Sequence, residues 1–266
     1  MNSIIIATDF SEASENAMHY GASLAQQLDA SIVLAHIFQT PVTMNDMPVV
    51  VFSADELKKS SDAGLQRCRE ELLKNYPALS IKTESRLGSV SEELNILAEE
   101  TNPFAIVMGS HNVKGLERML FGSTTVSVVR HAHYPVLAMP AHFKNFTVSN
   151  IVLAADLENI PDELSGKIIE TVQQLRGSLH IVHVKMKEET EKPNALLERL
   201  NILSPSYETV EHKKVNSGLK NYAQEVKADL LVILPHEHNL ADRLFFRVHT
   251  EDIITSMHIP VLAIKC

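Results

Sequence analysis

Residues 3–9 read SIIIATD, and residues 150–156 read NIVLAAD, so an apolar run is followed in both places by an aspartate. Two further runs, SIVLAHI at 31–37 and SLHIVHV at 178–184, repeat with the same offset of 147 residues. Asp9 thus corresponds to Asp156, and His36 corresponds to His183. Similarity at a fixed offset indicates a repeated structural unit, and here the repeat has the length of a whole domain.

The ends of the two units match at a different offset. AIVMGSH (105–111) corresponds to LLVILPH (230–236), and YPVLAMP (134–140) to IPVLAIK (259–265), now 125 residues apart. The second unit is therefore shorter in its middle, and the first carries an extra loop over 38–53 and a longer helix. We predict one domain over 1–142 and another over 148–266, with the polar segment 141–150 between them.

Within the first unit, short β-branched runs alternate with helical periodicity. Apolar residues at 13, 17, 20, 24 and 28, for example, follow the spacing of one helix face. The pattern predicts strands over 3–8, 31–37, 80–86, 104–108 and 135–139, and helices over 12–28, 54–75, 90–101 and 123–132. Continuous apolar strands that alternate with helices indicate parallel sheets covered on both faces. The predicted fold class is α/β, with two tandem, Rossmann-like, doubly wound five-stranded sheets of order 3-2-1-4-5 related by a pseudo-twofold axis.

Composition excludes several functional classes. The formal net charge is −9, which argues against a nucleic-acid partner because phosphate backbones are bound by clustered Lys and Arg. Cys68 and Cys266 lack the CxxC spacing, so we interpret them as free thiols in a reducing compartment. The sequence shows neither a signal peptide nor the roughly 20 apolar residues of a membrane span. We expect no membrane partner and a cytoplasmic location.

Candidate ligand-binding residues follow the predicted strands. Asp9 follows the first strand and Gly109 the fourth, so the order 3-2-1-4-5 brings them together where the strand order reverses, the usual ligand crevice of such sheets. The segment 122–124 (GST) begins a predicted helix, whose unpaired N–H groups and dipole attract anions. It is either a phosphate seat or a hydroxyl cap of the helix, and the local sequence leaves both open.

The stretch MGSHNVKGLERMLFGSTT (108–125) carries a resemblance to a known family. Its spacing, Gly109-Ser-His-Asn112, nine residues, then Gly122-Ser123, resembles the Gly-2x-Gly-9x-Gly-(Ser/Thr) pattern of nucleotide-binding universal stress proteins. The ATD after the first strand and the final PVL strand are also similar to that family. The resemblance covers both units and implies a tandem member. Asn112 stands where the family has its second glycine, and Asn tolerates the left-handed conformation.

The resemblance implies ATP or another adenine nucleotide as ligand, with Mg²⁺ as an optional companion. Asp9 would contact the adenosine, Ile37 would line the adenine pocket, and Met108 and Gly109 would follow the ribose and phosphates. His111 and Asn112 belong to the same turn, and Gly122, Ser123 and Thr124 would hold the phosphates. The family's pairing through the last strand implies that 134–140 and 259–265 meet within the chain as a pseudo-dimer, and a homodimer remains open.

The second unit departs from the pattern. Leu234, Glu237, Arg247 and Val248 replace Gly109, Asn112, Gly122 and Ser123. Because bulky side chains stand where phosphate must approach, we interpret this unit as a degenerate site that keeps its fold. Asp156 fits turn formation as well as ligand binding.

Three functions remain open: a stress-response regulator that binds a nucleotide without turning it over, a slow ATPase or self-phosphorylating protein, and an interaction module without nucleotide whose protein partner is unknown. No Walker lysine or kinase catalytic loop is present, so we assign no catalytic residue. His236 and His238 are interpreted as exposed polar sequence, and no metal site is assigned. His36 and His183 are interpreted as hydrogen-bonded buried histidines.

Overall fold

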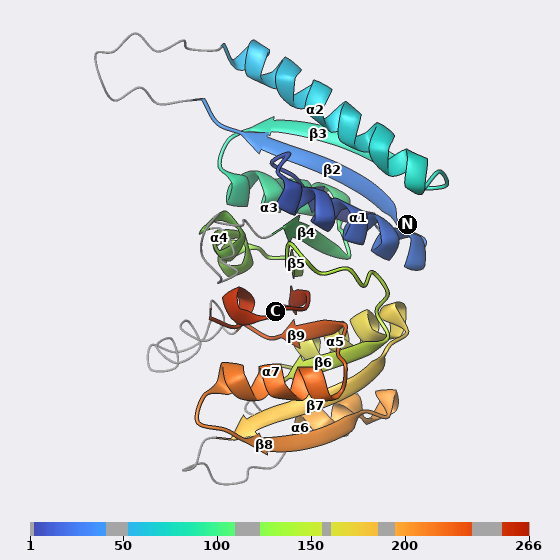
Figure 1. The fold of residues 1–266 in the computed structure, drawn as a ribbon, viewed down its shortest axis with the longest axis vertical. Coiled ribbons are helices and arrows are strands. Elements are labelled where there is room, and N and C mark those ends of the chain that lie inside the picture. Colours follow the sequence, from blue (N-terminus) through green and yellow to red (C-terminus); the bar gives the residue numbers. More distant parts are fainter. Residues whose placement is uncertain are drawn as a thin grey trace, which may run out of the picture.

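The structure, a computed structural model, describes residues 3–40, 53–109, 123–155, 161–185, 195–235 and 252–265. These residues form a ten-stranded sheet with helices on both faces (Figure 1). The strand order is β3-β2-β1-β4-β5-β10-β9-β6-β7-β8, which is the order 3-2-1-4-5 twice, the second time reversed. The predicted fold class is confirmed.

The first half of the chain supplies five of these strands. Its elements, in chain order, are β1 (Ser3–Ala7), α1 (Glu12–Gln27), β2 (Ser31–Phe38), α2 (Ala54–Asn75), β3 (Ile81–Leu87), α3 (Val90–Thr101), β4 (Ala105–Gly109), α4 (Ser123–His131) and β5 (Val136–Met139). Each predicted element of this half is present, with ends that differ from the prediction by no more than one residue.

The second half repeats the same succession in shorter form. Its elements are β6 (Asn150–Ala154), α5 (Asp162–Leu175), β7 (Ser178–Lys185), α6 (Ala195–Leu200), the 3-10 helix η1 (Asn201–Leu203), β8 (Ser206–Glu211), α7 (Val215–Glu225), β9 (Leu230–Ile233) and β10 (Val261–Ala263). The shortening falls on α6, which has 6 residues where α2 has 22.

The two halves meet through their last strands. β5 and β10 pair antiparallel, with Leu137 opposite Leu262, whereas the other strand pairs of the sheet are parallel. The predicted meeting of 134–140 with 259–265 is thus confirmed. The pairing also covers two strand edges that would otherwise be open to other chains.

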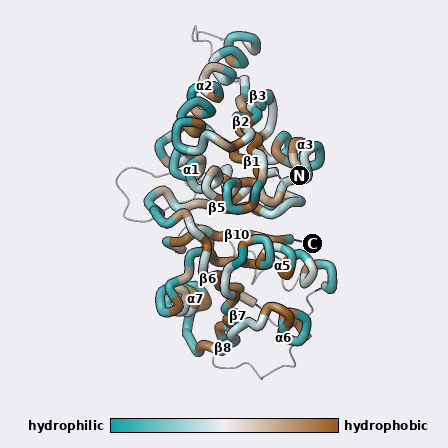
Figure 2. Tube along the Cα trace, turned by 90° about the vertical axis from the view of Figure 1, so that its right-hand side faces the viewer, coloured by the Kyte–Doolittle hydropathy of each residue, from teal (hydrophilic) through white to brown (hydrophobic). Residues whose placement is uncertain are grey.

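Alternate side chains of each strand enter two cores, one on each face of the sheet. Ile4 and Ile6 of β1 lie in the core under α1, α2, α5 and α6, while Ile5 lies in the core under α3, α4 and α7. Each core includes residues from both halves, and Figure 2 shows the hydrophobic strands inside the hydrophilic outer faces of the helices. The boundaries 1–142 and 148–266 therefore stay a prediction, because the sheet and both cores run across them.

The segment between the halves packs against α1. Tyr20 lies edge-on to Phe143 and Phe146, with ring centroids 6.4 and 6.0 Å away. The side-chain amide of Asn16 donates to the backbone oxygens of Pro140 and Phe143. The connection is thus a packed part of the fold rather than a simple polar linker.

Helix starts follow ordinary capping chemistry. Ser11 caps α1, and Ser53 forms a capping box with Glu56 at the start of α2. None of the helices in the described part of the chain is long and apolar enough to span a membrane.

Candidate functional site

The carboxyl ends of β1 and β4 form the switch point of the first half. β1 pairs with β2 on one side and β4 on the other, so the chain leaves toward opposite sides of the sheet at these two strands. Ligands of open α/β sheets bind at this point. The residues that follow β1 and β4, together with the start of α4, define the candidate site.

Asp9 makes a turn at the start of α1. Its Oδ1 accepts hydrogen bonds from the backbone N–H and the hydroxyl of Ser11, at 3.0 and 2.6 Å. Phe10 takes a positive φ of 63°, and its N–H donates to the hydroxyl of Thr8. The exposed Asp9 carboxylate therefore orders the loop that leads into α1, whether or not it also contacts a ligand.

Gly109 lies where β4 passes under the first turn of α1. A Cβ atom at this position would be 2.5 Å from the carbonyl oxygen of Ala13 and 3.0 Å from the Cα of Ser14. Because both neighbours are backbone atoms, no rotation of a side chain would relieve the contact. The glycine is required by the packing of α1 on β4, a reason that the sequence analysis did not foresee.

The start of α4 lies beside the end of β4. The buried hydroxyl of Thr125 donates to the carbonyl oxygen of Gly109 at 3.1 Å. Ser123 and Thr124, in the first turn, are exposed. Two parts of the predicted motif, Gly109 and the hydroxyls of α4, are thus brought together at the switch point.

The remaining predicted residues divide into three groups. Ile37 is half-buried near the end of β2, beside His36. Met108 is buried and belongs to the core under α3 and α4. His111, Asn112 and Gly122 lie outside the described residues.

The paired histidines occupy equivalent places in the two halves. His36 Nδ1 is 2.7 Å from the backbone oxygen of Thr8, and His183 Nδ1 is 3.2 Å from that of Ala155. Both side chains are half-buried rather than buried, which corrects the prediction. Their contacts are those of structural histidines that tie adjacent strands together.

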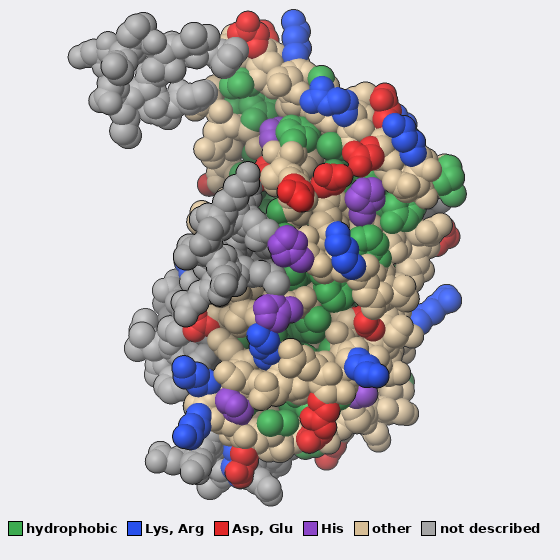
Figure 3. Space-filling model, in the orientation of Figure 1, with side chains coloured by type: hydrophobic (Ala, Val, Ile, Leu, Met, Phe, Trp, Pro, Cys, Tyr) green, Lys and Arg blue, Asp and Glu red, His purple; other side chains and the backbone are tan. Residues whose placement is uncertain are grey.

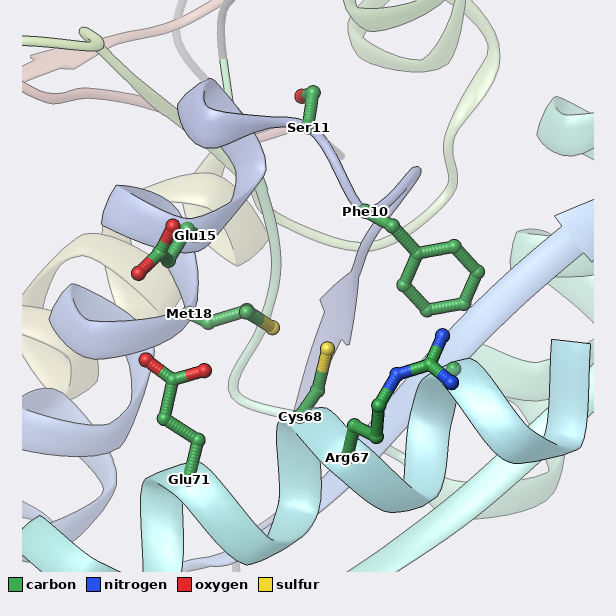
Figure 4. Close-up of a pocket in the computed structure, with 8 residues that line it drawn as sticks. Phe10, Ser11, Glu15, Met18, Arg67, Cys68 and Glu71 are labelled. Atoms are coloured by element: carbon green, nitrogen blue, oxygen red, sulfur yellow. The ribbon is translucent and has the colours of Figure 1, made fainter.

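A pocket of about 310 Å³ opens between α1 and α2 (Figure 4). Phe10 closes one end, where its ring lies over Gly64 and 4.3 Å from the His36 ring. Cys68 is a free thiol that lines the pocket. Burial, aided by the Glu71 carboxylate, raises the pKa of this thiol, so it is protonated at neutral pH.

The equivalent place in the second half differs in shape. Leu234 stands where the first half has Gly109, and its side chain is buried. α5 begins at Asp162, whereas the offset of 147 residues would start it at 159. Asp156, Glu237, Arg247 and Val248 lie outside the described residues.

The doubled 3-2-1-4-5 sheet, joined at its last strands, defines a tandem Rossmann-like α/β protein. The sequence model of the universal stress protein family matches residues 1–140 and 197–265. The chain belongs to the universal stress protein family, as the resemblance predicted.

Relatives extend over one unit or over both. Universal stress protein G of Shigella flexneri is 34% identical over 134 residues, which is 48% of this chain and 89% of that protein. A universal stress protein of Mycolicibacterium smegmatis is 23% identical and covers 98% of this chain and 96% of its own length. The solved structure of a universal stress protein from Archaeoglobus fulgidus superposes with a TM-score of 0.73 at 17% identity, covering 99% of this chain and 98% of that one. The last comparison supports the fold alone.

The structure also brings together Glu15, His19 and Glu71, a cluster of possible metal ligands that the sequence analysis did not predict. Glu15 and His19 lie on α1, and Glu71 lies on α2. Because β2 and residues 39–53 lie between the two helices in the chain, no local sequence motif could have shown the cluster. Only the spacing of Glu15 and His19, four residues apart on one helix, was visible in the sequence.

Proposed function

We propose that the first half of this universal stress protein binds ATP or another adenine nucleotide at the carboxyl ends of β1 and β4, as a cytoplasmic stress-response regulator. The adenosine would lie near Asp9 and Ile37, and the phosphates would lie at the start of α4. Mg²⁺ would accompany the phosphates as their counter-ion.

One observation carries the proposal: α4 begins at the switch point with exposed hydroxyls. Thr125 ties this turn to the end of β4, while Ser123 and Thr124 face outward. The N–H groups of a first helical turn have no partner within the helix, and its dipole favours negative charge. Such a turn suits a phosphate without any net positive charge on the protein.

The second half supports a different role. Leu234 fills the place of Gly109, and the sequence replaces Gly122 and Ser123 by Arg247 and Val248. We propose that this half binds no nucleotide and completes the sheet through β10. A chain with one site is the expected result.

Calorimetric titration of the full chain with MgATP, MgADP and AMP tests the proposal, together with mass spectrometry of any ligand that co-purifies. We expect a stoichiometry of one. Thr124→Val should weaken binding about 10-fold or more, because a hydrogen bond to a charged group contributes about 1.5–3 kcal/mol. Thr209→Val, on the distant strand β8, is the matched control.

Two results would contradict the proposal. One is the absence of heat with all three nucleotides and of any co-purified nucleotide, which would favour an interaction module. The other is equal affinity in the Thr124→Val and Thr209→Val variants, which would place the phosphates elsewhere. Release of phosphate from bound ATP would favour the slow ATPase instead of the regulator.

A further inference from the structure

Glu15, His19 and Glu71 bring three metal-binding atoms together between α1 and α2. One carboxylate oxygen from each glutamate and one imidazole nitrogen lie within 4.8 Å of one another. The His19 Nε2 to Glu71 Oε1 distance is 3.7 Å, which is too long for a hydrogen bond. This distance fits an ion pair when His19 is protonated, and a neutral imidazole would leave Nε2 able to bind a metal ion together with the two carboxylates.

The helices hold these side chains in place. Glu15 and His19 are four residues apart on α1, so they share one face of that helix. The Tyr76 hydroxyl, at the end of α2, donates to the backbone oxygen of His19 at 3.3 Å, and the two rings lie 6.3 Å apart. His19 is therefore fixed against α2, with only 22% of its side chain exposed.

The charges at this place favour a cation. Figure 4 shows the Glu15 and Glu71 carboxylates facing each other across the gap between the helices, whereas the Arg67 guanidinium lies on the Phe10 side of the pocket. Figure 3 shows acidic side chains and histidine gathered over this part of the surface. Among the described residues, no hydrogen bond to the Glu15 carboxylate is found. Two facing carboxylates repel each other unless a positive charge lies between them.

We propose that Glu15, His19 and Glu71 form a zinc site that joins α1 to α2, with water as the fourth ligand. Imidazole nitrogen and carboxylate oxygen are zinc ligands, with bonds of about 2.0–2.2 Å, so the ligand atoms of a tetrahedral site lie roughly 3.3–3.6 Å apart. The present separations are at most 4.8 Å, so closing to this spacing requires side-chain movements of about 1 Å, which the exposed Glu15 and the half-exposed Glu71 permit. Ca²⁺ and Mg²⁺ prefer sites built from more oxygen ligands, and the imidazole disfavours them.

The site belongs to the first half alone. At the offset of 147 residues, Asp162 and Gly166 stand in place of Glu15 and His19. The counterpart of α2 is the six-residue α6. The zinc ion would therefore hold in place the long helix that distinguishes the first half, and it does so independently of nucleotide binding.

Calorimetric titration of the chelator-treated full chain with ZnCl₂ tests the site. The background carries His236→Ala and His238→Ala, so that this second histidine pair cannot bind the ion. We expect one site, and His19→Ala or Glu71→Gln should weaken zinc binding by at least about 10-fold, the effect of losing even a residue that only orients a ligand. Co²⁺ in the same background should give the visible absorption of a four-coordinate ion.

Glu70→Gln is the matched control. It makes the same change one residue away, on an exposed carboxylate that accepts a hydrogen bond from Gln66. Glu70→Gln should bind zinc as the background does, and zinc should raise its thermal midpoint but not that of Glu71→Gln. Circular dichroism in EDTA checks that each variant is folded.

Undiminished zinc affinity in both His19→Ala and Glu71→Gln would overturn the proposal. So would the absence of zinc binding in the His236→Ala, His238→Ala background when the unaltered chain binds the ion. A loss of affinity shared equally by Glu70→Gln and Glu71→Gln would also overturn it, since it would indicate a general effect of surface charge.

Discussion

Gly109→Ala separates two explanations of the glycine at the end of β4. If Gly109 serves the fold, the variant loses stability whether or not nucleotide is present. If it serves only the approach of a ligand, the variant loses affinity and keeps its stability. The structure favours the first explanation, because an added Cβ would be 2.5 Å from the Ala13 carbonyl oxygen and 3.0 Å from the Ser14 Cα.

The loss of stability expected for Gly109→Ala can be calculated from the shift of α1 that the added Cβ would require. Overpacking of a dense interior costs about 1–3 kcal/mol, and we expect the upper end because α1 itself has to shift. Replacing glycine lowers the entropy of the unfolded chain and returns about 0.4–1 kcal/mol. The net loss in the free energy of unfolding is therefore about 2 kcal/mol. With a urea m-value of about 3 kcal/mol/M, this loss lowers the midpoint by about 0.7 M.

Urea denaturation without nucleotide, followed by circular dichroism, measures this loss. Gly166→Ala is the control, because Gly166 is exposed inside α5 and a Cβ there meets nothing within 4 Å. It should raise the free energy of unfolding by about 0.5–1 kcal/mol, the usual gain of alanine over glycine in a helix. A Gly109→Ala protein as stable as the unaltered chain would refute the packing argument.

Three further predictions concern other places in the chain. Gly122→Val should weaken nucleotide binding strongly by blocking phosphate approach, whereas Val248→Ala should leave calorimetric affinity unchanged; equal affinities would place the phosphate seat elsewhere. Tyr20→Phe should raise the urea midpoint or leave it unchanged, since the buried Tyr20 hydroxyl has no hydrogen-bond partner among the described residues; a clear loss would reveal a partner. Burial lowers the pKa of His258 below 6.5, and the nearby Lys220 ammonium, which donates to His258 Nε2 at 2.7 Å, lowers it further. The contribution of His258 to the free energy of unfolding is therefore present above pH 6.5 and decreases as the pH falls below it. Lys220→Met should raise this pKa in an NMR titration, and an unchanged value would contradict the contact.

The elements of the fold could be predicted because each carries a local pattern. The helix α2 was predicted over its observed range, 54–75, from the helical periodicity of that segment. The strands could be placed because their apolar runs are bounded by polar residues. The pairing of β5 with β10 followed from the family resemblance and the repeated PVL strands.

The candidate site could be predicted only in part. Position along the chain placed Asp9 and Gly109 after adjacent strands, and the structure brings Gly109 together with Thr125. Nothing local indicated that Met108 belongs to the core, because an apolar residue at a strand end can face either side of the sheet. His36 was predicted to be buried for the same reason: its exposure depends on which parts of the chain cover the end of β2, and the local sequence does not show this.

The sequence by itself determined the duplication, the order of helices and strands, and the loss of the glycine motif from the second half. These features depend on residue spacing within short segments, where period and turn chemistry act. Only the tertiary structure decided that the backbone of α1 excludes a side chain at Gly109, and that Glu15 and His19 meet Glu71 between two helices. Both contacts depend on the placement of α1 relative to β4 and α2, which is set by packing across the whole sheet and not by any neighbouring residues in the chain.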